Sequence, residues 1–171
     1  EDGIRDLIVT GVQTCALPIW ENTLVKRFNS IKSWKAFRLG SPSVALPDVL
    51  TVNNVESTIF TIEAKSGTGT TLQVPFDQIE RCLNWIDNFQ VYQKREVILA
   101  FKFLSKKRIG VGKYEKRELR EFYKVWDKKK MVIDCVCTYD GKTYALKNGK
   151  QKKLVLNDFS MPFKSKHQLF Y

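Results

Sequence analysis

The sequence predicts an α/β fold in which a central mixed sheet is flanked by helices and followed by an antiparallel meander. Three observations support this: two segments with apolar residues at helical spacing, several short apolar runs, and Asp-Gly and Asn-Gly turns near the C-terminus. The 171 residues suffice for one substantial core, and no repeat or low-complexity linker divides them. We expect a single domain over 20–171, with its core over 20–105, a helix and meander over 106–157 and an irregular tail over 158–171.

The first nineteen residues stand apart, because they follow no clear period. Val9 to Ile19 resembles a translated sequencing-library adapter. We therefore expect residues 1–19 to be non-native and exclude them from the fold prediction, as for an expression scar. A signal peptide is the alternative, but the acidic start and the missing basic region disfavour it.

Residues 20–31 are predicted to form an amphipathic helix, since Leu24, Val25 and Phe28 recur at helical spacing. Glu21 lies in its first turn. This carboxylate could favour the helix dipole, or it could be an acidic arm of a metal site.

A short strand over 34–39 carries Arg38 and is followed by a loop of small residues over 40–46. The loop contains Ser41 and Ser43. Its composition suits a close approach to a phosphate backbone, but also an ordinary connector.

The next two strands are predicted to pair as an antiparallel hairpin around a turn at Asn53-Asn54. Asp48 opens the first strand, and Glu63 then lies near the same end of the hairpin. Glu63 and Lys65 are two residues apart, so they face the same side of the sheet. A divalent cation between the two carboxylates would explain this otherwise costly cluster, and magnesium prefers such oxygen ligands. The alternative is a simple salt bridge between Glu63 and Lys65.

The rest of the chain is predicted to contain further strands and helices. Residues 67–71 form a turn without the P-loop pattern, and residues 72–74 are extended. A helix beginning at Pro75 carries Gln78 in its first turn, and a buried strand follows over 96–104. The later elements are a charged helix over Tyr114–Trp126 and strands over 131–137, 143–147 and 152–156, with turns at Asp140-Gly141 and Asn148-Gly149.

Composition limits the possible partners and sites. The 29 Lys and Arg against 18 Asp and Glu give a formal net charge of +11, which indicates a polyanionic partner, nucleic acid before anionic membrane. No apolar run reaches the roughly 18 residues needed to span a membrane. The single histidine, His167, lies in a polar tail, which excludes Ser-His-Asp and Cys-His sites. The four cysteines show no CxxC pair, with Cys135 and Cys137 read as core residues, and this fits a cytoplasmic location.

The order of these pieces resembles the PD-(D/E)xK nuclease superfamily, and within it the archaeal Holliday junction resolvases of the Hjc type. The resembling segments are ENTLVKRF, FRLGSPS, LPDVLTV, FTIEAKSG, VPFDQIERCLNW and VILAFKFL, which together cover 20–105. A lone Pro-Asp with Glu-x-Lys is a weak signal, whereas six pieces in register are a stronger one. The resemblance implies a restriction-endonuclease-like fold and favours a metal centre over a salt bridge. Asn22 departs from the arginine that the family often has there.

The resemblance also implies roles for individual residues. It implies acidic metal ligands at Glu21, Asp48 and Glu63, the basic motif residue at Lys65, a phosphate contact at Arg38, a catalytic loop serine at Ser41 or Ser43, and a supporting, DNA-contacting residue at Gln78. Among the basic side chains, we expect DNA contacts from Lys26, Arg27, Lys102, Lys106, Lys107 and Arg108, although the last four could form a solvated face instead.

The expected function is a structure-selective endonuclease that resolves four-way junctions by magnesium-dependent phosphodiester hydrolysis, giving paired nicks. Manganese could replace magnesium. Lys65 and the metal are the candidates for orienting water and stabilising charge. The expected partners are branched DNA and a second copy of the chain, with surplus apolar residues such as Trp85, Phe89 and Phe101; neither a membrane nor a small-molecule substrate is expected. The alternatives are another PD-(D/E)xK nuclease acting on flaps or duplex DNA, and a non-catalytic branched-DNA-binding protein.

Overall fold

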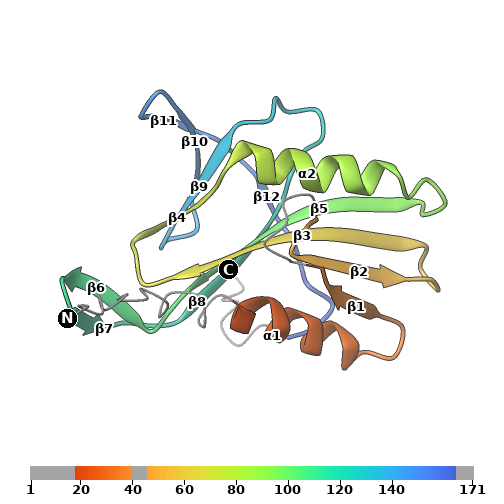
Figure 1. The fold of residues 1–171 in the computed structure, drawn as a ribbon, viewed down its shortest axis with the longest axis horizontal. Helices are drawn as coiled ribbons and strands as arrows, with labels where there is room; N and C mark the ends of the chain where they lie inside the picture. Colours follow the sequence, from red (N-terminus) through yellow and green to blue (C-terminus); the bar gives the residue numbers. More distant parts are fainter. Residues whose placement is uncertain (1–17, 40–45, 165–171) are drawn as a thin grey trace, which may run out of the picture.

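The computed structural model describes residues 18–39 and 46–164 (Figure 1). Within these ranges the elements are α1 (Pro18–Asn29), β1 (Lys35–Arg38), β2 (Val49–Asn53), β3 (Thr58–Gly67), β4 (Thr71–Val74), α2 (Phe76–Asp87), β5 (Lys94–Phe103), β6 (Lys106–Gly110), β7 (Lys113–Lys116), β8 (Arg120–Val125), β9 (Asp134–Thr138), β10 (Thr143–Lys147), β11 (Lys150–Lys153) and β12 (Asn157–Asp158). The expected mixed α/β class is confirmed, with a core made mostly of sheet. No helix in this part of the chain is long and apolar enough to cross a membrane.

The described strands form three sheets. The largest has the order β1-β2-β3-β5-β8-β12, and the second has the order β11-β10-β9-β4. The β6–β7 hairpin forms a two-stranded sheet of its own. In the largest sheet β3 and β5 run parallel and the other neighbours run antiparallel. Figure 1 shows α1 and α2 on opposite faces of this sheet, so its central strands are covered on both sides.

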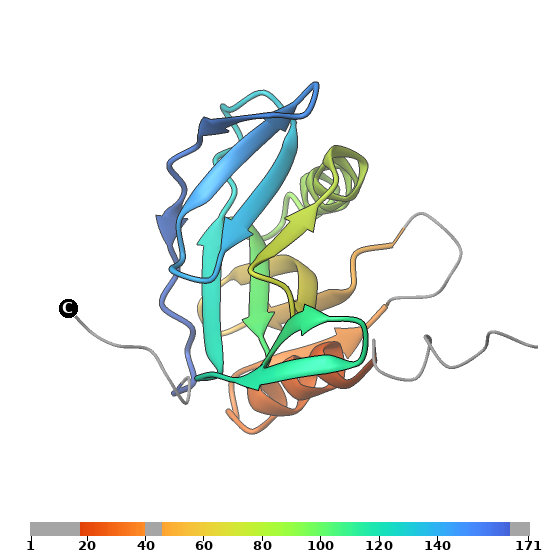
Figure 2. The ribbon, with the colours of Figure 1, turned by 90° about the vertical axis from the view of Figure 1, so that its left-hand side faces the viewer.

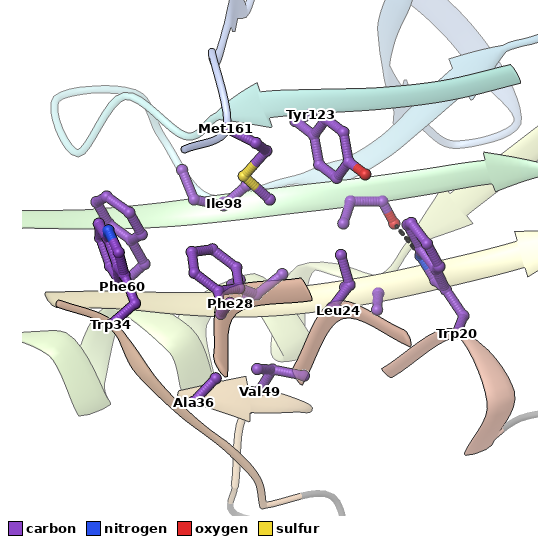
Figure 3. Close-up of a cluster of buried hydrophobic side chains, with 13 residues drawn as sticks. Trp20, Leu24, Phe28, Trp34, Ala36, Val49, Phe60, Ile98, Tyr123 and Met161 are labelled. Carbon is purple, nitrogen blue, oxygen red and sulfur yellow. Dashed lines mark hydrogen bonds between the residues drawn. The ribbon is translucent and has the colours of Figure 1, made fainter. Parts of the chain in front are cut away.

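The core is divided by the six-stranded sheet. On the α1 face, Trp20, Leu24 and Phe28 pack with the alternate β3 residues Phe60 and Ile62 (Figure 3). The C-terminal segment after β12 also packs on this face, with the side chains of Phe159, Met161 and Phe163. Both faces of β3 and β5 are largely buried, and β5 accordingly contains the continuous apolar run Val97 to Phe101, as predicted for 96–104.

The second helix covers the opposite face. Ile79, Cys82 and Ile86 are fully buried, at the helical spacing seen in the sequence. Cys135 and Cys137 lie in the same cluster, which confirms them as core residues. Burial raises the pKa of both thiols to about 12, so they stay protonated.

Several predicted turns are confirmed. The β2–β3 turn follows Asn53, whose side-chain oxygen accepts the N–H groups of Val55 and Glu56, both at 3.1 Å. Asn148 and Gly149 join β10 to β11 and have φ angles of 51° and 72°. Both values lie in the left-handed region that a two-residue hairpin of this type requires.

The predicted helix over Tyr114–Trp126 is wrong, because this segment forms β7 and β8. Its many charges resembled an exposed helix, yet β8 lies inside the large sheet between β5 and β12. Glu121 is buried in this strand, and its partner Arg27 is 94 positions away. Because the partner is so distant, no local sequence pattern predicts the burial of this charged residue. β4 also joins the meander, pairing with β9.

Candidate active site

Asp48, which lies just before β2, is electrostatically coupled to Glu21 of α1 and to Glu63 of β3. Val49 pairs with Ile62, and this register places Asp48, just before β2, beside Glu63. An Asp48 carboxylate oxygen accepts the backbone N–H of Ala64 at 2.8 Å, which ties the start of β2 to β3. The structure therefore brings Asp48 and Glu63 to the same end of the hairpin, as the sequence predicted.

The side chain of Glu63 is fully buried and is held between two cations. Its Oε1 accepts a hydrogen bond from Lys65 at 2.7 Å, and its Oε2 accepts one from Arg81 at 3.0 Å. Burial raises the pKa of Glu63 to about 7 and the negative charge of Asp48 adds to this rise, although Lys65 and Arg81 oppose it. The salt bridge between Glu63 and Lys65, which was the alternative to a metal site, is thus present within a larger charged group.

Glu21 belongs to the same electrostatic group. Burial raises its pKa, and the charge of Asp48 contributes to the rise, while Arg38 and Lys65 lower it. The Oε2 atom of Glu21 is buried and has no hydrogen-bond partner among the described residues. A buried carboxylate oxygen without a partner is costly, so this atom is suited to a ligand or cation.

Arg81 was missed by the sequence reasoning. It lies three residues after Gln78 on α2, so the two side chains share a helix face. This three-residue spacing was the sequence signal that could have placed Arg81 beside Gln78. Gln78 lies in the first turn of α2, and its Oε1 atom is also buried without a hydrogen-bond partner in the part of the chain that the structure describes.

The donor set fits magnesium in its chemistry, because Glu21, Asp48 and Glu63 offer hard carboxylate oxygens. Among the described residues, however, no group of three or more His, Cys, Asp or Glu side chains is close enough to hold a metal ion. Both Glu63 oxygens are also bonded to cations. A metal shared by the three acids would therefore require them to draw closer, with Lys65 or Arg81 releasing an oxygen of Glu63.

The other predicted site residues lie in different surroundings. Arg38 is exposed at the end of β1, near enough to Glu21 to influence its pKa. Lys26 is exposed on α1. Ser41 and Ser43 lie outside the described residues.

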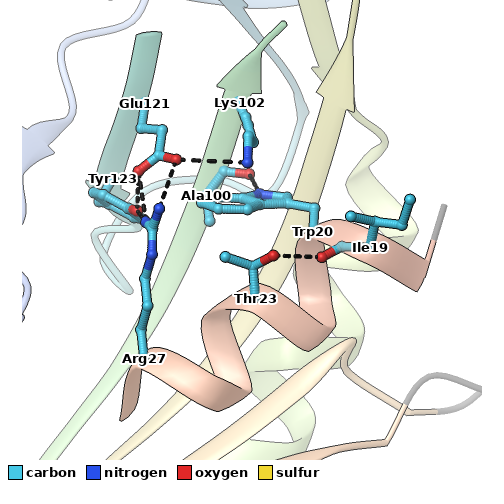
Figure 4. Close-up of polar contacts among 8 residues, drawn as sticks. All are labelled: Ile19, Trp20, Thr23, Arg27, Ala100, Lys102, Glu121 and Tyr123. Atoms are coloured by element: carbon cyan, nitrogen blue, oxygen red, sulfur yellow. Dashed lines mark hydrogen bonds and ion pairs between the residues drawn. The ribbon is translucent and has the colours of Figure 1, made fainter. Parts of the chain in front are cut away.

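Arg27 and Lys102 both contact the buried carboxylate of Glu121 (Figure 4). Arg27 binds both oxygens of Glu121, at 2.6 and 3.1 Å, and the ammonium of Lys102 lies 3.7 Å from Glu121. The hydroxyl of Tyr123 donates to Glu121 at 3.0 Å, and Lys102 stacks 4.6 Å from the centre of the Trp20 ring. This network holds α1 on the sheet, so the geometry does not favour the predicted DNA contacts of Arg27 and Lys102.

Comparisons with known proteins give a limited likeness. No protein-family model and no curated protein matches the chain. Among solved structures, it is similar to Hjc from Archaeoglobus fulgidus, a Holliday junction resolvase from an archaeal hyperthermophile. The TM-score is 0.42 at 19% sequence identity, covering 62% of this chain and 71% of that chain. The function therefore has to be argued from the residues of the site.

Proposed function

We propose that the protein is a magnesium-dependent, structure-selective endonuclease that nicks four-way DNA junctions. The observation that carries this proposal is the electrostatic coupling of Glu21 and Glu63 to the same two residues, Asp48 and Lys65. The chain also carries a formal net charge of +11, which suits a polyanionic substrate.

Each residue has a role that its chemistry can fill. Asp48 and Glu63, with Glu21 beside them, would hold magnesium, which supplies Lewis-acid polarisation of the phosphate. Lys65 lies next to Glu63 and is partly exposed, so its ammonium can orient water or stabilise charge that develops on the phosphate. Arg38 at the exposed end of β1 can contact a phosphate.

Junction selectivity and dimerisation belong to the same proposal. Phosphate contacts carry no structural preference, so discrimination must come from DNA shape. A two-fold symmetric homodimer would match the symmetry of a four-way junction. Phe101, named as a surplus apolar residue, is fully buried and cannot serve that interface, whereas Trp85 and Phe89 are only partly buried.

The second candidate is a branched-DNA-binding protein without catalysis. It is favoured by the two ion pairs that neutralise Glu63 without any metal. It does not explain the buried Glu21 oxygen, which has no hydrogen-bond partner within residues 18–39 and 46–164.

A cleavage assay separates these candidates. The purified protein, with magnesium, is expected to nick a synthetic four-way junction at symmetric positions on opposing strands, and to cut a linear duplex of equal length far more slowly. Equal cutting of the two substrates would contradict junction selectivity. If neither magnesium nor manganese supports any cutting, the nuclease proposal fails.

The raised pKa of Glu63 predicts a pH dependence of stability in EDTA. The folded chain holds the proton of Glu63 up to about pH 7, whereas the ordinary pKa is 4.5, so the free energy of unfolding falls as pH rises between these values. The expected loss is on the order of 3 kcal/mol. Denaturant unfolding of the wild type and Glu63→Gln across this range measures it, because the variant lacks the titrating group.

Magnesium provides the companion measurement. A cation favours the ionised carboxylate, so added magnesium should reduce the fall in stability of the wild type and leave Glu63→Gln unaffected. The same pH slope with and without magnesium would contradict metal binding at Glu63. Identical slopes for the two proteins in EDTA would contradict the raised pKa.

A further inference from the structure

The β6–β7 hairpin, which we call the arm (residues 106–116), projects from the body of the protein. Its two strands pair with each other and with no other strand of the described residues. Figure 1 shows the arm extending beyond the end of the six-stranded sheet where β3 and β5 finish, and Figure 2 shows it facing the viewer from that end. An isolated two-stranded hairpin is marginally stable, so its residues are not explained by core packing.

One face of the arm is cationic. Lys106 pairs with Lys116, and Arg108 pairs with Tyr114, so these four side chains lie on the same face. All four residues are exposed. Two lysines directly opposite each other repel and destabilise a hairpin. The only acid of the arm, Glu115, pairs with Lys107 on the other face.

The root of the arm is fixed to the strand that carries the candidate site. The N–H of Arg108 donates to the Thr68 carbonyl at 3.1 Å, and the N–H of Leu104 donates to the Gly67 carbonyl at 2.9 Å. Arg117 directly follows the arm, and its Nε donates a hydrogen bond to the Leu104 carbonyl at 2.8 Å. Its guanidinium also stacks 4.5 Å from the centre of the Tyr139 ring.

The arm therefore begins close to the carboxylates. Thr68 is three residues after Lys65, which corresponds to about 10 Å along an extended chain. The DNA major groove alone is about 12 Å wide, which is more than this distance. A duplex with one phosphate at the carboxylates would therefore also reach the arm.

We propose that the face formed by Lys106, Arg108, Tyr114 and Lys116 is a DNA-binding surface that holds the substrate beside the carboxylates. Its three cations bind backbone phosphates, and the Tyr114 ring stacks on a base exposed at the branch point. This inference rests on the proposed function for its substrate, branched DNA. It assigns the binding of that substrate to one face of one hairpin.

Charge removal tests the phosphate contacts. The triple variant Lys106→Gln/Arg108→Gln/Lys116→Gln is compared with a control that loses the same charge from the exposed strand β11, Lys150→Gln/Lys152→Gln/Lys153→Gln. Binding to a four-way junction is measured in EDTA at several salt concentrations. We expect the arm variant to bind about 10- to 100-fold more weakly, with a salt slope lower by about 2 to 3, and the control to bind as the wild type does. Equal weakening in both variants, or none in the arm variant, would overturn the proposal.

Tyr114 tests the base contact without changing charge. Tyr114→Leu should weaken junction binding about tenfold, whereas Tyr114→Phe keeps an aromatic ring and should bind as the wild type does. Wild-type binding by the leucine variant would overturn the stacking contact. Because these measurements need no cleavage, a protein that binds through the arm but never cuts would refute the nuclease and leave the arm assignment standing.

Discussion

Replacing Asp48 with asparagine is expected to slow magnesium-dependent nicking of a four-way junction by about 10²–10³-fold, the loss typical when a group that stabilises transition-state charge is removed. Asparagine keeps an oxygen that can accept the Ala64 N–H bond of 2.8 Å, so the β2–β3 connection survives. The variant loses only the negative charge. Single-turnover cleavage of a labelled junction measures the effect, and binding in EDTA should match the wild type.

The matched control is Asp87→Asn, which removes a carboxylate from an exposed ion pair with Lys128 at the C-terminal end of α2. This variant should cleave at the wild-type rate. Asp48→Asn also has a readout besides activity, since the charge of Asp48 raises the pKa of both Glu21 and Glu63. Both pKa values should fall in the variant, as followed by NMR titration. Undiminished cleavage by Asp48→Asn would remove Asp48 from the catalytic group.

The sequence was most informative where short-range rules apply. Strand alternation and turn chemistry predicted that Asp48 and Glu63 would meet at one end of a hairpin, and the register confirms it. The helix after Pro75 was also recognisable, because its apolar face repeats at 3.6 residues and its start has a proline. These features depend on neighbours within a few residues or on a single turn.

The failures involve partners far apart in the chain. Arg27 and Glu121 are 94 residues apart, so no local pattern indicates that the guanidinium of Arg27 pairs with the buried carboxylate of Glu121. A buried glutamate in an otherwise polar segment looks solvent-exposed, and β8 was therefore predicted as a helix. In the same way, Arg81 becomes part of the site because α2 packs over β3, and its spacing from Gln78 indicates only that the two side chains share a helix face.

The arm was not predicted, because part of it lies in the segment that was wrongly predicted to be a helix. Its Gly110-Val111-Gly112 turn lies just before the segment predicted as a helix, so the basic run over 106–108 was read without its partner strand. Pairing with β7 is what places Lys116 and Tyr114 beside these cations. The function of the run thus depends on a register that composition alone does not set.

Arg27→Met is expected to lower the free energy of unfolding by about 3–5 kcal/mol, because it leaves the carboxylate of Glu121 buried without its main partner. Arg27 binds both oxygens of this carboxylate, and the Glu121 side chain is only 1% exposed. Burial alone would raise the pKa of Glu121, but the hydrogen bonds and charge of Arg27 outweigh it and lower the pKa. The stabilisation from this pair is therefore present above pH 4.5 and is lost as pH falls below it.

Two comparisons decide whether the buried charge is the cause of this loss. Arg27→Met/Glu121→Leu replaces both charges by apolar groups and should recover most of the lost stability, because no unpaired carboxylate remains. Lys128→Met breaks an exposed pair with Asp87, at 3.3 Å, and should cost no more than about 1 kcal/mol. Urea unfolding of the four proteins at pH 7 provides the values. A double variant as unstable as Arg27→Met would show that the loss comes from the packing of α1 rather than from the charge of Glu121.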